Sequence, residues 1–158
     1  MTIAANLAKF LEHRHVDYQV VSHAPTGSSL QSARAAHVPP ERIAKAVLID
    51  DGEHLLLTVL PGTCHVQLGE LRQQLGRPVR LAAEERVAEV FDDCAAGAIP
   101  PIGPAYGLET VLDERLIEQP EIYFEAGDHE HLLQMACGDF IALLRGCKRG
   151  RFCRPVPD

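Results

Sequence analysis

Lys45 is the residue whose type and surroundings most clearly predict chemistry in this sequence. It stands inside an otherwise apolar run, residues 43–49, which reads Ile-Ala-Lys-Ala-Val-Leu-Ile. A lysine in a covered strand must reach an edge, meet a carboxylate or point into a ligand cavity, because an unpaired buried charge is unfavourable. An ammonium group in a cleft binds phosphate or carboxylate groups as a point charge. We therefore predict that Lys45 borders a cavity for an anionic group.

A loop rich in glycine and proline is the second stretch with chemical potential. Residues 97–104 read Gly-Ala-Ile-Pro-Pro-Ile-Gly-Pro. Proline fixes φ and removes a backbone donor, whereas glycine opens the region of positive φ. Such a backbone is stiff and can present its carbonyl and N–H groups to a ligand. The alternative is a hydrophobic surface turn, because glycine and proline punctuate many ordinary loops.

The eight histidines match no H-x-x-x-H or H-E-x-x-H metal motif. The densest group is Asp128-His129-Glu130-His131, which has no cysteine or further ligand near it in the sequence. We therefore predict no metal site. In an extended strand His129 and His131 share one side, so both are candidates to border a substrate cavity.

The sequence gives little support for a serine or cysteine nucleophile. No G-x-S-x-G elbow is present. Cys64 is next to His65, but adjacent residues of a strand point to opposite faces. An unrelated hydrolase or redox protein that uses Cys64 or Cys94 remains an alternative.

Cysteine usage and hydropathy indicate a cytoplasmic protein. The five cysteines are an odd number and contain no C-x-x-C pair, which is typical of reduced thiols rather than of a disulfide framework. The N-terminus lacks the charged and apolar regions of a signal peptide. No apolar run approaches the ~20 residues that span a bilayer, so we expect no membrane partner.

The charge of the chain is unevenly distributed. The 158 residues carry a formal net charge of -7, whereas a tight nonspecific nucleic-acid binder is usually basic. Residues 145–154 nevertheless contain five Lys or Arg side chains and no acid. This segment is either a phosphate-contacting tail or a solvated one. The length predicts a single domain over 1–158, and its last residues, 145–158, form a basic tail.

The periodicity of the apolar residues predicts an α+β fold. Expected helices cover 3–14, 29 to a stop before Pro39, 66–75, 84–91, 113–117 and 139–145, and expected strands cover 16–21, 43–50, 54–60, 79–82, 106–112, 121–125 and 131–136. Ser28 and Gln31 form a capping box, and Asp51-Gly52 indicates a hairpin. The strands do not alternate regularly with crossover helices, which favours a mixed, curved sheet over a doubly wound one.

The order of these pieces resembles the YbaK-type family of aminoacyl-tRNA editing domains. This family includes the editing insertion of bacterial prolyl-tRNA synthetase and its free-standing relatives. The resemblance covers roughly 18–144 and rests on five stretches: the capped helix from Ser28, Ala44 to Leu48, Val59 to Gly62, Gly97 to Gly103, and Ala126-Gly127 before a histidine-bearing strand. The glycine-proline loop matches the family's G-x-x-P-x-G pattern with one residue of leeway.

The resemblance implies a strongly curved, barrel-like sheet surrounded by helices, and a trans-acting deacylase that hydrolyses the ester of mischarged tRNA. It implies that Lys45 holds the terminal phosphate or ribose of the acceptor end and that the loop backbone orients the ester and the attacking water. It implies no metal and no cofactor. The residues expected at the site are Lys45 and Gly103 as catalytic groups, and Ser28, Gly97, Ile99, Pro100, Pro101 and either His129 or His131 as substrate-binding groups.

Two positions depart from the family pattern. Gln31 stands where the family often has Glu, and Ala46 follows the lysine where many deacylating members have Asn, Ser or Thr. Residues 92–97 and 123–129 resemble a subgroup that also occurs fused to signalling modules. These features keep open a second function, a noncatalytic ligand-binding or regulatory module. Expected partners are the acceptor end of aminoacyl-tRNA, bound weakly and salt-sensitively, and either a synthetase or an associated signalling module.

Overall fold

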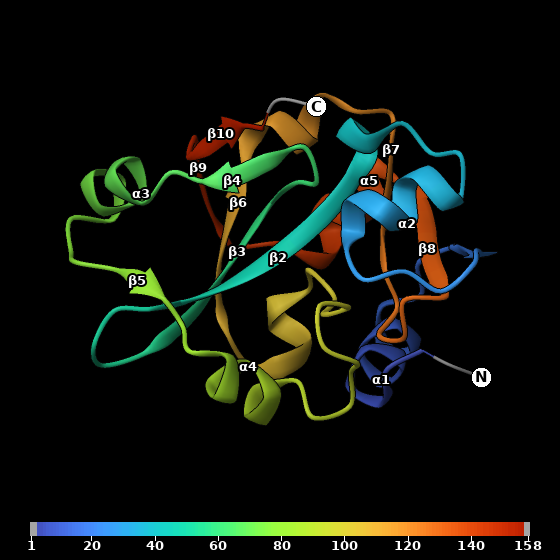
Figure 1. Cartoon of the computed structure of the whole chain (residues 1–158), viewed down its shortest axis with the longest axis horizontal. Coiled ribbons are helices and arrows are strands. Elements are labelled where there is room, and N and C mark those ends of the chain that lie inside the picture. The colour runs from blue at the N-terminus through green and yellow to red at the C-terminus, as the bar shows by residue number, and fades with distance from the viewer. Residues whose placement is uncertain (1–2, 157–158) are drawn as a thin grey trace.

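The computed structural model describes residues 3–156 and is built on a mixed sheet whose long central strand, β2, crosses the molecule (Figure 1). The strand order is β1-β8-β7-β2-β3-β6-β9, with β5 paired to β2. The strands of this sheet are β1 (Gln19–Ser22), β2 (Ile43–Asp50), β3 (Leu55–Pro61), β5 (Arg80–Leu81), β6 (Glu109–Asp113), β7 (Glu121–Glu125), β8 (His131–Ala136) and β9 (Lys148–Gly150). A separate antiparallel ribbon joins β4 (Cys64–Val66) to β10 (Cys153–Pro155).

Parallel and antiparallel pairs occur in the same sheet, which confirms the predicted α+β class with a mixed sheet. β2 pairs antiparallel with β3 but parallel with β7, and β6 runs parallel to both β3 and β9. Within residues 3–156 the edge strands β1 and β9 do not pair with each other. The sheet is therefore open in the part of the chain that the structure describes.

Five α-helices and three short 3₁₀ turns connect and cover the described strands. They are α1 (Ala5–Arg14), α2 (Ser29–Ala35), α3 (Leu68–Leu75), α4 (Glu84–Val90), α5 (Cys137–Leu143), η1 (Pro40–Arg42), η2 (Gly103–Tyr106) and η3 (Glu114–Glu118). In residues 3–156 none of the helices is long and apolar enough to cross a membrane. Figure 1 shows α1 and α4 at one end of the sheet and α3 near the β4–β10 ribbon.

The sheet is covered on both faces, as its apolar strands predict. Leu56 and Leu57 follow each other on β3 and point to opposite faces, yet both are fully buried. One face packs against α1 and α5 through a cluster that includes Phe124 and Phe140. The other packs against α3 and the ribbon through Leu71 and Phe152. β2 and β3 are therefore held rigidly between two apolar layers.

The start of α2 is capped as predicted, with one shift. The backbone N–H of Gln31 donates to the Ser28 hydroxyl over 3.2 Å. The Gln31 side chain reaches back to the N–H of Gly27, one residue before the expected partner. This cap fixes the Gly27–Ser28 backbone at the side of β2, since α2 contacts β2.

The C-terminal segment differs from a solvated tail. It forms β9 and β10, and Phe152 between them is 1% exposed. The backbone N–H groups of Phe152 and Cys153 both donate to Oδ2 of the buried Asp113 over 2.9 Å. In the sequence this segment is recognisable mainly by its positive charge. Phe152, the apolar side chain that anchors it, belongs to no periodic apolar pattern.

The expectation of five reduced thiols is wrong for Cys64 and Cys153, which form a disulfide. The β4–β10 register brings their Cα atoms to 5.3 Å, within the range that a disulfide spans. The two cysteines are 89 residues apart in the sequence. Because the pairing follows from strand register, no local motif in the sequence indicates it.

Candidate functional site

A cavity of about 350 Å³ opens beside the first half of β2. Its wall combines residues from the α2 cap, β2, the ribbon and the glycine-proline loop. The residues used below are Ser28, Lys45, Ala46, His65, Gly97 and Val156. Segments from five parts of the chain therefore meet around one lysine.

Lys45 lies on β2 opposite Leu60 of β3, and its side chain is half-buried. Burial lowers the pKa of its ammonium group, and no other group contributes to that shift. No carboxylate in residues 3–156 forms an ion pair with it, unlike the arginines of the hairpin end of the sheet. Within residues 3–156 the cavity thus contains a partly desolvated cation without a counter-ion, which suits an anionic ligand.

Ser28 brings a hydroxyl to the same cavity. Its oxygen accepts the cap hydrogen bond from the Gln31 backbone, and this leaves the hydroxyl proton available to a ligand. Ala46, next to Lys45, adds no polar group. The polar side chains that line the cavity are those of Ser28, Ser29, Lys45 and His65. Backbone groups supply the remaining polar contacts.

Gly97 is the part of the predicted loop that reaches the Lys45 cavity. Its φ is 79°, a conformation that residues with a β-carbon rarely adopt. A β-carbon at this position would lie 3.2 Å from Nε2 of His129 and 3.3 Å from the Gly27 carbonyl oxygen. A side chain at residue 97 would therefore strain the backbone and crowd both the α2 cap and His129, and glycine avoids both effects.

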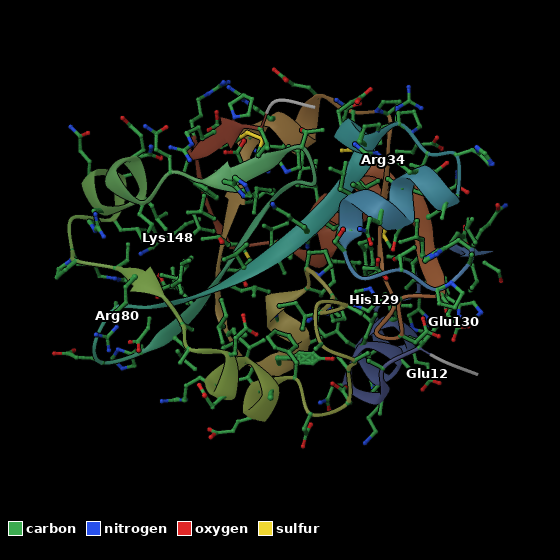
Figure 2. The ribbon with its side chains drawn as sticks, viewed as in Figure 1. Glu12, Arg34, Arg80, His129, Glu130 and Lys148 are labelled. Atoms are coloured by element: carbon green, nitrogen blue, oxygen red, sulfur yellow. A yellow bond between two sulfur atoms is a disulfide. The ribbon has the colours of Figure 1, made fainter. Side chains whose placement is uncertain are left out.

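His129 is buried behind the loop rather than on a strand. Its φ is 60°, and it lies between β7 and β8. Its Nε2 contacts the Ala96 carbonyl oxygen, and its Nδ1 lies 3.8 Å from Oε1 of the buried Glu125. In Figure 2 His129 lies on the side of the molecule away from Arg80 and Lys148. The expected shared strand face of the two histidines is therefore wrong.

His131 begins β8 and has a different environment. Its Nδ1 lies 2.7 Å from Oδ2 of Asp128, and its backbone pairs with Ser22 of β1. It is not among the residues that line the Lys45 cavity. Of the two candidate histidines, His129 is the one with a contact to Ala96 and Gly97 in the loop that forms the cavity wall.

The rest of the predicted loop turns away from Lys45. Pro100 and Pro101 are buried, and Ile99 lines a neighbouring cavity of about 490 Å³ on the other side of Gly97. Gly103 is buried at the start of η2, where a β-carbon would collide with the Thr110 hydroxyl. The structure thus brings Lys45, Ser28 and Gly97 together, and it places Gly103 outside their cavity.

The sequence did not indicate the contribution of the ribbon to the site. His65 on β4 and Val156 after β10 complete the cavity wall. The N–H of Val156 donates to the Thr63 carbonyl over 2.8 Å, which extends the ribbon to the cavity. Neither residue belongs to a local motif, because the two strands come together only in the folded chain.

The cysteine alternative has no support in the geometry. Cys64 is in the disulfide and has no free thiol. Burial raises the pKa of the Cys94 thiol to about 12, so it stays protonated at neutral pH and is a poor nucleophile. In the described residues, no group of three or more His, Cys, Asp or Glu side chains is arranged to hold a metal ion.

Comparison with solved structures identifies the same fold in other proteins. A candidate trans-editing enzyme for prolyl-tRNA synthetase is 26% identical with a TM-score of 0.81, and the match covers 96% of each chain. The hypothetical protein APE2540 is 20% identical with a TM-score of 0.82, over 94% of this chain and 99% of that one. A protein from Marinobacter aquaeolei VT8, described as a candidate signal transduction protein, is 21% identical with a TM-score of 0.77. That match covers 94% of this chain and 30% of the longer one.

Comparison by sequence gives the family. No curated protein gave a significant match. The model of the aminoacyl-tRNA editing domain matches residues 23–143, a range that contains Ser28, Lys45, Gly97 and His129. The chain therefore belongs to the aminoacyl-tRNA editing domain family.

Proposed function

We propose that this protein is a trans-acting deacylase that hydrolyses the ester of mischarged tRNA. The observation that carries the proposal is the half-buried Lys45, which has no ion pair within residues 3–156, in a cavity that is also lined by Gly97. The 3′ end of a tRNA is anionic, and its aminoacyl ester requires placement against a water molecule. A cation and a fixed backbone loop in one cavity can supply both functions.

The proposed reaction needs little covalent chemistry from the protein. Lys45 holds the terminal phosphate or ribose, and the backbone around Gly97 orients the ester carbonyl. Water attacks the carbonyl carbon, the ester C–O bond breaks, and the products are the free amino acid and a tRNA with a free 3′-terminal hydroxyl. An aminoacyl ester is already activated, so positioning the water supplies much of the acceleration, and N–H donors stabilise the oxyanion.

The other predicted site residues take supporting roles in this proposal. Ser28 donates its hydroxyl proton into the cavity, and His129 holds the loop from behind. Gly103 acts indirectly, because its close packing on Thr110 fixes the far end of the loop. Pro100 and Pro101 stiffen that loop. Ile99 gives it an apolar side that lines the neighbouring cavity.

The basic ribbon is the proposed contact for the acceptor stem. Arg154 on β10 lies opposite His65 on β4, and cross-strand neighbours share a face. Lys148 and Arg151 form ion pairs with Glu109 and Glu114, whereas no ion pair is present for Arg154 in the described residues. We expect this contact between exposed cations and phosphates to be weak and salt-sensitive. We place this reaction in the cytoplasm, where tRNAs are charged.

A panel of misacylated tRNAs tests the proposal. Purified protein should release the amino acid from at least one mischarged tRNA and leave the correctly charged one intact. Editing of this kind is needed where a synthetase pocket discriminates between small side chains by only about 1–3 kcal/mol. No release from any member of the panel would overturn the proposal, and release that Lys45→Ala leaves unchanged would overturn the assigned site.

A noncatalytic regulatory module is the second candidate. It is favoured by Ala46, which leaves the position after Lys45 without a polar group in the cavity. The Marinobacter structure, in which the same fold makes up 30% of a chain described as a signal transduction protein, is compatible with such a role. This candidate predicts a rise in melting temperature with a small aminoacyl or nucleotide ligand, together with no turnover on the whole panel.

A further inference from the structure

Unpartnered buried polar atoms are concentrated behind the Gly97 loop. Five buried side-chain N or O atoms in the described residues have no hydrogen-bond partner, and four of them belong to Glu125, His129 and His23. They are both carboxylate oxygens of Glu125, Nδ1 of His129 and Nε2 of His23. Such atoms are rare because burial without a partner is costly. Their concentration beside one wall of the site therefore calls for a physical explanation.

The ring hydrogens of the two histidines can be assigned from their neighbours. Nε2 of His129 meets the Ala96 carbonyl oxygen, and Nδ1 of His23 meets the Ala24 carbonyl oxygen over 2.8 Å. A carbonyl oxygen only accepts, so each of these nitrogens carries a hydrogen. In the neutral rings, Nδ1 of His129 and Nε2 of His23 are then both acceptors. If Glu125 is ionised as well, three acceptor groups meet, and in the described residues the Ser32 hydroxyl is the one side-chain donor that acts on the carboxylate.

One additional proton resolves this arrangement. We propose that Glu125 and His129 share a single proton at neutral pH, and that the protonated pair positions the Ala96–Gly97 backbone as the wall of the Lys45 cavity. Glu125 is thus a positioning residue that acts through His129. The expected effect on catalysis rests on the proposed function. The shared proton and its effect on the loop rest only on the contacts of Glu125 and His129.

The surroundings of Glu125 favour retention of this proton. Burial raises the pKa of its carboxyl group, and the negative charge of Asp128 acts in the same direction. The Ser32 hydroxyl and the imidazoles of His129 and His23 act in the opposite direction. Glu125 is 1% exposed, so bulk water does not solvate the carboxyl group. The proton resides either on the acid or as an imidazolium beside a carboxylate, and 3.8 Å is within ion-pair distance.

Two contacts transmit the state of the pair to the loop. The His129 ring donates to the Ala96 carbonyl, and the Ala95 N–H donates to the Gly127 carbonyl over 2.7 Å. Gly97 follows directly and packs on the same ring. When the shared proton leaves, the Nδ1 lone pair of His129 faces a carboxylate and repels it. The ring then moves from Glu125, and its bond to Ala96 loosens.

The sign of the pH dependence follows from the raised pKa of Glu125. A group whose pKa is raised by folding contributes stability that is fully present below its unfolded pKa and is lost as pH rises through the folded value. Order in the loop should therefore fall as pH rises through a value above the usual range of a glutamate. Deacylation should decline over the same interval.

Glu125→Gln gives a sharp test, because the amide offers Nδ1 of His129 a permanent N–H donor. In ¹H–¹⁵N spectra of the full, ligand-free chain, the wild-type Gly97 amide and His129 ring nitrogens should shift together with rising pH. In Glu125→Gln both should stay near their low-pH positions. The matched control is Glu121→Gln, the same change on the same strand, which should leave the wild-type transition in place.

The outcomes distinguish this inference from the proposed function. A Gly97 transition that persists in Glu125→Gln, or its absence from the wild type, would overturn the inference even if the protein deacylates tRNA. Coupled shifts without any deacylation would support the shared proton and overturn the enzymatic function alone. Where turnover is measurable, the pH profile of kcat/KM should flatten on its alkaline side in Glu125→Gln, and an unchanged profile would contradict a positioning role.

Discussion

The two ends of β2 border cavities of nearly equal size, about 350 Å³ beside Lys45 and about 340 Å³ beside Asp50. At the Asp50 end two arginines are paired with acids: Arg80 lies 3.4 Å from Asp50, and Arg77 lies 3.1 Å from Asp51. Arg72, which also lines that cavity, donates from Nε to the Val79 carbonyl oxygen over 3.0 Å. At the Lys45 end the cation has no protein counter-ion in the described chain. The size of a cavity therefore does not identify the site. Within residues 3–156 the Lys45 end differs in having a cation with neither an ion pair nor a side-chain hydrogen bond, whereas the arginines of the Asp50 end have partners.

The largest expected effect comes from removing the unpaired cation. Lys45→Ala should lower kcat/KM for deacylation by about 100-fold, a loss typical of a group that stabilises charge at a reacting centre. Arg80→Ala, at the paired end, should change it by no more than about twofold. Single-turnover release of the amino acid measures both. Equal losses in the two variants would remove the distinction between the two ends of β2.

A pair of glycines sharpens the comparison. Gly97 and Gly52 both have positive φ, at 79° and 93°, but a β-carbon on Gly52 would meet no atom within 4 Å. Each change to alanine should destabilise the fold by about 1–2 kcal/mol. Only Gly97→Ala should also lower kcat, by about tenfold, because it displaces the loop from His129. Thermal unfolding and deacylation kinetics of both variants check this prediction. Equal kcat values for the two variants would show that the position of Gly97 does not affect catalysis.

A smaller effect is expected at the ribbon. Arg154→Ala should reduce the slope of log affinity for tRNA against log salt by about 1, because one phosphate contact is lost. Arg149→Ala, an exposed arginine on β9, is the matched control and should leave the slope unchanged. Binding measured from low to high salt gives both values. A wild-type affinity that does not depend on salt would contradict the proposed contact.

The smallest effect is expected from the paired end itself. The backbone N–H of Gly52 and then Arg80 hold the pKa of Asp50 below its usual range. A group whose pKa is lowered by folding contributes stability that is present above its unfolded pKa and is lost as pH falls through the folded value. The melting temperature of the wild type should therefore drop slightly more in acid than that of Asp50→Asn. A larger fall in melting temperature in acid for Asp50→Asn than for the wild type would contradict a stabilising contribution from ionised Asp50.

Local patterns predicted the central strands well. The bounds of β2, Ile43–Asp50, follow from an apolar run between prolines and the Asp51-Gly52 turn, and those of β7 and β8 were also predicted correctly. The helix that ends at Gly76 is capped by that glycine at φ 70° as expected. These elements are specified by neighbouring residues, so a single sequence is enough to locate them.

Long-range pairing was not predictable in the same way. β4 and β10 are three residues each and exist because the folded chain brings them together across the Cys64–Cys153 bridge. The sequence could therefore indicate Lys45 and the loop, but not the wall formed by His65. In the sequence Glu125 is only the polar residue at the end of a strand. Its burial depends on packing by α2 and by the turn at residues 127–130, which neighbouring residues do not reveal.

Titration with a 3′-end mimic shows directly whether the cavity beside Lys45 binds the acceptor end. The probe is an amide-linked, nonhydrolysable analogue of an aminoacylated adenosine 5′-phosphate, titrated into the labelled full chain. We predict ¹H–¹⁵N shift changes at Gly97 and His65, none at Gly52 or Val79, and loss of the changes in Lys45→Ala. Shifts centred on Gly52 and Val79, or a response that Lys45→Ala leaves intact, would contradict the assignment of the unpaired end of β2 as the site.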